Sequence, residues 1–272
     1  MYNRITSLKN LIKEDAKKAS IEIDKSRDYL SKQALAEILF LLGSRFADDG
    51  NYDESFVSLR EAEKITKDNE LLCDIFLCYV DNYIFLDKYE EAESFLNKCL
   101  ELTKDNLKLG DVYFNMGLIY ELKSEWNKSI YPFEKSIKYF EKVDGIDSFK
   151  IETSKYYLGF ISLRRLKQVY NGLEILKELI SGRDVTNYTK HNSLVEIGHY
   201  YFENKDYENA LVYYSRSLEY IDESFDGRVY FYMGDSHRVL KDKVNAIRYY
   251  EKYLEYDPDD KNTLESLKNL RE

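Results

Sequence analysis

The sequence MGLIY at Met116–Tyr120, followed by SIYPF at Ser129–Phe133, carries a pattern that returns along most of the chain. Related stretches begin at Leu42, Ile197 and Met233, each with a glycine next and an aromatic residue or histidine three positions after it. A helix pair that repeats in tandem cannot bury its apolar face alone, so it stacks on its neighbours. The repeat therefore predicts an all-α solenoid of antiparallel helix pairs with a concave surface, suited to holding another molecule.

The composition agrees with a helical protein. Of the 272 residues, 44% are hydrophobic and 33% are charged, which excludes both a disordered chain and a membrane-embedded one. Only two prolines and 11 glycines are available for tight turns. This scarcity favours helices joined by short loops over a β-sandwich or a barrel.

The charge is acidic overall but unevenly distributed. The formal net charge is −10, which opposes the phosphate backbone and excludes nucleic acid as a partner. Residues 1–35 hold eight Lys/Arg against five Asp/Glu, a net of +3, so the rest of the chain carries −13. The acidic body would suit a partner with some basic character.

The chain offers no pattern for chemistry or for a membrane. Its three cysteines form no C-x-x-C pair, and His191 and His199 lie two helical turns apart, too far for one metal ion. No catalytic motif is present, so we expect neither an enzyme nor a cofactor. The N-terminus lacks a secretory core, and apolar runs such as Ile38–Leu42 are short. We therefore expect a cytoplasmic protein without membrane insertion.

The repeat resembles a known family. Its glycines, or the valine at position 80, recur at spacings of 37, 37, 42, 39 and 36 residues, at Gly43, Val80, Gly117, Gly159, Gly198 and Gly234. The repeat is similar to the tetratricopeptide repeat, whose usual unit has 34 residues. The shared pattern is Leu-Gly-x-x-Tyr, followed by Ala-x-x-x-Phe and then Pro. The resemblance covers residues 36–258 and implies a right-handed superhelix of six slightly long repeats.

The expected organisation is one continuous solenoid domain. Residues 1–35 would form an N-terminal cap with one helix over 4–24, and residues 259–272 a C-terminal capping helix with Leu264, Leu267 and Leu270 on its inner face. Repeat four, at 151–181, is degenerate, and its second helix fits only if one residue is inserted. The longest linker is predicted at 144–148.

The resemblance also implies where a ligand would lie, because this family commonly binds along the first (A) helices of its repeats. The lysine clamp that some members use for a terminal carboxylate is absent here. Apolar, aromatic and partly acidic residues occupy the corresponding positions. The predicted groove residues are Phe40, Ser44, Asp81, Phe114, Tyr156, Phe160, His199, Phe231, Asp235 and Arg238.

The sequence thus predicts a scaffold or adaptor that binds a partner peptide or helix through apolar anchors. A basic partner would be steered by four acidic residues, Asp81, Glu121, Glu196 and Asp235. Arg228 and Arg238 could instead meet an acid. Two alternatives stay open. The long repeats look somewhat like those of bacterial peptide receptors, which suggests a peptide-sensing regulatory protein. A self-assembling structural subunit, hence a homo-oligomer, is the other.

Overall fold

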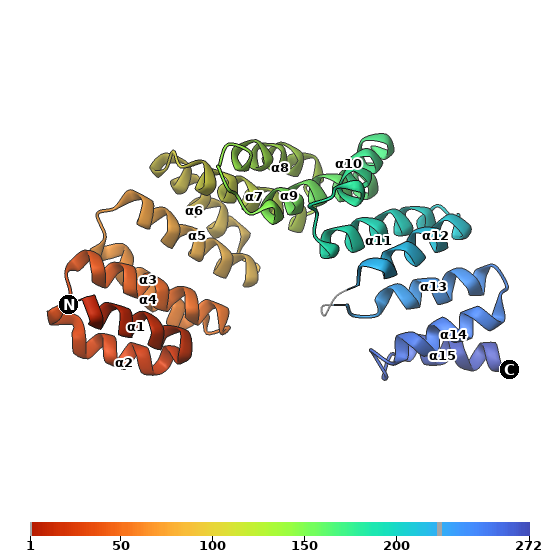
Figure 1. Cartoon of the computed structure of the whole chain (residues 1–272), viewed down its shortest axis with the longest axis horizontal. Coiled ribbons are helices and arrows are strands. Elements are labelled where there is room, and N and C mark those ends of the chain that lie inside the picture. The colour runs from red at the N-terminus through yellow and green to blue at the C-terminus, as the bar shows by residue number, and fades with distance from the viewer. Residues whose placement is uncertain (1, 222–224) are drawn as a thin grey trace. The chain divides into compact units, whose positions relative to one another are not determined.

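The computed structural model describes residues 2–221 and 225–272, with side chains from Arg4 onward (Figure 1). Within these ranges every regular element is helical and no strand occurs. Contacts divide the chain into two compact units, Met1–Asp144 and Gly145–Glu272. The boundary falls where the sequence predicts the longest linker. The single continuous domain stays a prediction.

The first unit contains a short helical hairpin followed by three helix pairs. In each pair the A helix packs on the following B helix. The hairpin comprises α1 (Tyr2–Glu14), α2 (Ala16–Ser26) and the 3₁₀ turn η1 (Arg27–Tyr29); the pairs are α3 (Lys32–Asp48) with α4 (Tyr52–Ile65), α5 (Asn69–Phe85) with α6 (Tyr89–Leu102), and α7 (Asn106–Leu122) with α8 (Trp126–Phe140).

The hairpin corrects the expectation of one helix over residues 4–24. Asp15 has extended backbone angles, φ −155° and ψ 96°, and its carboxylate accepts a hydrogen bond from the Lys18 backbone N–H at 2.9 Å. Asp15 therefore ends α1 and caps α2. The apolar spacing passes through the break without interruption, because Ile12 and Ala16 are both buried. Periodicity alone could not reveal the turn.

The second unit contains three further pairs and a terminal helix. They are α9 (Ser148–Phe160) and the π-helical turn η2 (Ile161–Arg165) with α10 (Val169–Ser181), α11 (Asn187–Glu203) with α12 (Tyr207–Ser217) and the 3₁₀ turn η3 (Leu218–Tyr220), α13 (Arg228–Val239) with α14 (Lys243–Leu254), and α15 (Lys261–Arg271). The helix α15 packs on α14 through Leu267 and Leu270, as expected. Leu264 was wrongly assigned to the inner face, because its side chain is 46% exposed.

The repeated glycines lie where an A helix meets its B helix most closely. A Cβ atom on Gly117 would lie 2.8 Å from the Phe133 ring, and one on Gly198 would lie 2.5 Å from the Tyr214 ring. Both distances are far below ordinary van der Waals contact. The sequence pattern therefore records a packing requirement: glycine on one helix makes room for a large side chain on the other.

Repeat four contains the inserted residue that its sequence requires. In the other repeats, 12 positions separate the A-helix residue at the close helix contact from the small residue that opposes it on the B helix, as from Gly43 to Ser55. In repeat four the corresponding residues, Gly159 and Gly172, are 13 positions apart. The extra residue lies in η2, where the Leu166 N–H donates to the Ile161 carbonyl five residues earlier, at 3.0 Å. A π turn absorbs one residue without breaking the helix. The turn also holds Arg164, which pairs with Glu196 of the site described below.

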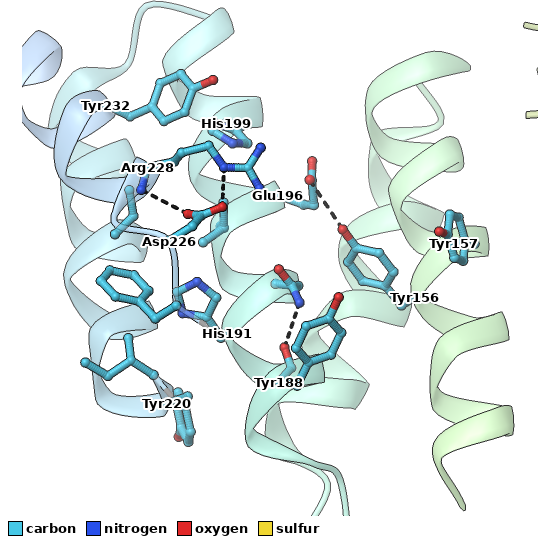
Figure 2. Close-up of a pocket in the computed structure, with 15 residues that line it drawn as sticks. Tyr156, Tyr157, Tyr188, His191, Glu196, His199, Tyr220, Asp226, Arg228 and Tyr232 are labelled. Atoms are coloured by element: carbon cyan, nitrogen blue, oxygen red, sulfur yellow. Dashed lines mark hydrogen bonds and ion pairs between the residues drawn. The ribbon is translucent and has the colours of Figure 1, made fainter. Parts of the chain in front are cut away.

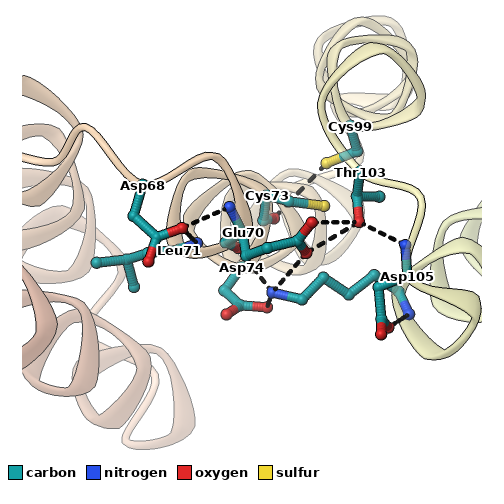
Figure 3. Close-up of polar contacts among 9 residues, drawn as sticks. Asp68, Glu70, Leu71, Cys73, Asp74, Cys99, Thr103 and Asp105 are labelled. Atoms are coloured by element: carbon teal, nitrogen blue, oxygen red, sulfur yellow. Dashed lines mark hydrogen bonds and ion pairs between the residues drawn. The ribbon is translucent and has the colours of Figure 1, made fainter.

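In the first unit, a polar clamp ties α5 to α7 beside two buried cysteines (Figure 3). The Lys108 ammonium donates to Asp74 Oδ1 and to the Glu70 carbonyl oxygen, each at 2.6 Å. Beneath the clamp the thiol of Cys99 donates to the Cys73 carbonyl oxygen at 3.6 Å. Both cysteines are fully buried and unoxidised. They pack as small apolar side chains.

Candidate functional site

The A helices of the second unit line a cleft of 470 Å³ (Figure 2). Its side chains come from α9, α11 and α13 and from the connection that leads into α13. They are Tyr156, Tyr157, Tyr188, His191, Asn192, Val195, Glu196, His199, Tyr220, Ile221, Phe225, Asp226, Arg228, Val229 and Tyr232. Five of these 15 residues are tyrosines, so the wall combines aromatic area with hydroxyl groups.

Ring contacts fix the aromatic walls. On α9, Tyr156 stacks on Phe160 with ring centroids 6.3 Å apart. Across the cleft, His199 on α11 meets Tyr232 on α13 edge to face, with centroids 4.3 Å apart. Edge-to-face pairs restrict both rings. The walls are therefore preformed surfaces against which an apolar group can pack.

A half-buried ion pair closes the inner wall. The Arg164 guanidinium donates to Glu196 Oε2 at 2.7 Å, and the two side chains are only 18% and 14% exposed. Arg164 also pairs with Glu203. Burial raises the pKa of Glu196, and the neighbouring Arg164 opposes that rise. Because the charge of Glu196 is balanced inside the protein, it presents little net charge to a ligand.

The histidine on the inner wall is held neutral. His199 Nδ1 lies 2.8 Å from the Tyr214 hydroxyl. Burial, together with the positive charges of Arg164 and Arg228, lowers the pKa of His199 to about 3. At neutral pH the imidazole is thus an uncharged hydrogen-bonding group.

This burial makes stability depend on pH. Unfolding returns the His199 pKa from about 3 to its ordinary value near 6.5, so the unfolded chain binds the extra proton as the pH falls. Between pH 7.5 and 5 the free energy of unfolding should drop by about 2 kcal/mol more in the wild type than in His199→Gln. Urea denaturation at both pH values measures this. A His237→Gln control keeps His199 and should keep the steep dependence; equal slopes in the wild type and His199→Gln would contradict it.

The mouth of the cleft is polar and exposed. Asp226 accepts hydrogen bonds from the backbone and the side chain of Arg228, as Figure 2 shows. On α11, the Asn192 side-chain amide donates to the Tyr188 carbonyl oxygen at 3.0 Å. The paired charges of Asp226 and Arg228 and the amide of Asn192 give a ligand both donors and acceptors without a net charge.

The structure brings together only some of the predicted groove residues of this unit. Tyr156 and His199 line the cleft, and Phe160 supports Tyr156 from behind. The other three, Phe231, Asp235 and Arg238, gather around the buried ring of Tyr250: Phe231 contacts the ring, Asp235 accepts from its hydroxyl at 2.6 Å, and the Arg238 Nε donates to the hydroxyl at 3.1 Å.

In the first unit the predicted residues do not form one site. Phe40 packs against the core, and Phe114 meets Phe133 edge to face. Asp81 is exposed, while Ser44 lies in a separate cleft beside α1.

The predicted groove residues came mainly from the fifth and ninth positions of each A helix. The cleft also uses the sixth position, at Tyr157, Glu196 and Tyr232, and the second, at Asn192 and Arg228. The sequence singled out Glu196 and Arg228 for their charge alone, and Tyr157, Asn192 and Tyr232 were missed. Large side chains at the sixth position of three consecutive repeats are the available signal.

Comparisons with known proteins agree with this architecture. The family model described as Tetratricopeptide repeat matches residues 227–260, and a second one of the same description matches residues 80–106 and 191–223. These stretches are tetratricopeptide repeats. The predicted family and all-α solenoid fold are confirmed, and the six predicted helix pairs are all present. Among curated proteins, none matches the sequence.

Solved structures share this fold. RapI in its apo form has a TM-score of 0.74 at 16% identity, over 98% of this chain and 79% of RapI. The apo quorum sensor NprR from B. thuringiensis has a TM-score of 0.71 at 14% identity, over 99% of this chain and 79% of NprR. A tetratricopeptide repeat protein from Parabacteroides merdae has a TM-score of 0.67 at 16% identity, over 100% of this chain and 98% of that one. No described helix combines the length and apolarity needed to cross a bilayer.

Proposed function

We propose that this protein is a scaffold or adaptor whose second unit binds an extended segment of a partner protein in the cleft between α9, α11 and α13. The observation that carries the proposal is the 470 Å³ hollow on the A-helix face, walled by aromatic rings. Concave sites with apolar walls and a few placed polar groups are where proteins bind ligands. Tetratricopeptide repeats themselves support a role in protein interaction.

The lining suggests how the segment is held. The rings of Tyr156, Tyr188 and Tyr232 offer apolar faces for one or two anchoring side chains. The amide of Asn192 and the tyrosine hydroxyls can bond the backbone of an extended peptide. The cleft's own charges are paired, so a partner's basic character would act mainly on the association rate, through the net charge of −10. We propose binding without catalysis, in the cytoplasm.

A peptide-sensing regulatory role is the second candidate. The observation that favours it is the likeness to the quorum sensor NprR over 99% of this chain. A short free peptide would use the same cleft as a segment of a larger protein. The self-assembling subunit stays a prediction from the sequence.

The test is selection of peptides from a random phage-displayed library against the full chain. Asn192→Trp fills the cleft, and Asn171→Trp adds the same bulk at an exposed position on α10. Circular dichroism checks that both variants fold. Selected peptides should bind the wild type and Asn171→Trp alike, and bind Asn192→Trp at least about tenfold more weakly. Equal binding to both variants, or no enriched peptide, would overturn the proposed function.

A further inference from the structure

A second cleft, of 660 Å³, lies within the first unit between α1 and α3. It has a different chemistry from the tyrosine-lined cleft. The helix α1 contributes Ile5, Thr6, Lys9, Asn10, Ile12 and Lys13; the helix α3 contributes Leu41, Ser44, Arg45 and Asp48. Three cations thus face one carboxylate in a chain whose net charge is −10.

The two lysines carry charge that the protein itself does not balance. Among the residues that the structure describes, neither Lys9 nor Lys13 has a carboxylate partner. Arg45, in contrast, pairs with Asp49 at 2.9 Å. Lys9 and Lys13 are four residues apart on one helix, where like charges repel and cost stability. An anionic ligand between them would relieve that repulsion.

The floor of the cleft is apolar. Ile5 and Ile12 on α1 and Leu41 on α3 line the cleft together, and Ile5 and Leu41 are only half-buried. A ligand that matches the whole cleft therefore combines negative charge with an aliphatic group. Asn10 and Ser44 add hydrogen-bonding groups at the same surface.

We propose that this cleft is a second interaction site, which binds an acidic segment of a partner protein that also carries an aliphatic anchor. Charge complementarity selects the acidic side chains, and the isoleucine–leucine floor holds the anchor. A duplex nucleic acid or an anionic membrane fits less well. Both are extended polyanions that the acidic body of the chain repels, and nucleic acid has no aliphatic group for the floor.

The probe is a fluorescein-labelled peptide of sequence Glu-Leu-Glu-Glu-Leu-Glu, compared with its glutamine counterpart by fluorescence anisotropy on the full chain. One variant is Lys9→Glu with Lys13→Glu. The matched control is Lys17→Glu with Lys18→Glu, which reverses two exposed lysines on α2 of the same hairpin, outside the cleft. Both double variants change the net charge equally, so they separate a local site from the general field.

The glutamate peptide should bind the wild type more tightly than the glutamine peptide. Charge reversal in the cleft should weaken it about tenfold or more, and the control reversal should change it less than about twofold. Equal losses in the two double variants, or no preference for glutamate, would overturn the proposal. So would tighter binding to duplex DNA or to phosphatidylserine vesicles than to the peptide. The tyrosine-lined cleft is untouched by these variants, so this site can fail while the proposed function stands.

Discussion

Gly172→Ala should destabilise the second unit by about 2–3 kcal/mol, the cost of overpacking a close contact. Helix propensity alone predicts the opposite sign, because alanine in a helix is favoured over glycine by about 1 kcal/mol. A Cβ atom at Gly172 would lie 2.5 Å from the backbone nitrogen and 2.7 Å from the Cα of Leu163. These atoms belong to the π turn, so they cannot rotate away as a side chain would.

The control for this substitution is its neighbour. Asn171 is exposed on the same helix, so Asn171→Ala should leave stability unchanged or raise it slightly. Urea denaturation followed by circular dichroism measures both variants. Hydrogen exchange read by mass spectrometry should show faster exchange in α9 and α10 of Gly172→Ala. An increase in stability for Gly172→Ala would mean that the close approach of α10 to η2 is wrong.

The packing of the repeats could be predicted because it requires particular residue types at fixed spacings in the sequence. A glycine such as Gly198 is needed wherever a ring such as Tyr214 crosses its helix, so the pattern reports a contact between helices. The inserted residue of repeat four was predictable for the same reason. When the spacing between two packing residues is one residue longer than in the other repeats, the extra residue must be absorbed by a local change in the helix or loop between them.

Other features of the structure do not require a recognisable residue pattern in the sequence. The turn at Asp15 is set by one residue's backbone angles, while the apolar spacing on either side continues unchanged. Among the apolar residues of α15, the sequence does not distinguish the exposed Leu264 from the buried Leu267. Which face of α11 lines the tyrosine-lined cleft is set by how the neighbouring helices pack against it. Residue types predicted an aromatic site, but its sixth-position members required the structure.

Arg164→Met should cost the second unit about 3 kcal/mol at pH 8, because it leaves the half-buried carboxylate of Glu196 without its partner. Adding Glu196→Leu should recover most of this loss, since an apolar pair replaces the ion pair. Urea denaturation of the two single variants and the double variant completes the cycle. Failure of the second substitution to recover stability would mean that Arg164 acts through packing alone.

The same variant should show a characteristic dependence on pH. Burial already raises the pKa of Glu196, and loss of Arg164 removes an opposing influence, so the pKa rises further. An acid whose pKa is higher in the folded state than in the unfolded state favours folding at low pH and loses that contribution as the pH rises. Removing Arg164 also lessens the penalty for protonating His199. Both effects act in one direction: the cost of Arg164→Met should shrink from pH 8 to pH 5. A cost that stays constant or grows over this range would show that the charge of Arg164 does not sustain the ionised Glu196.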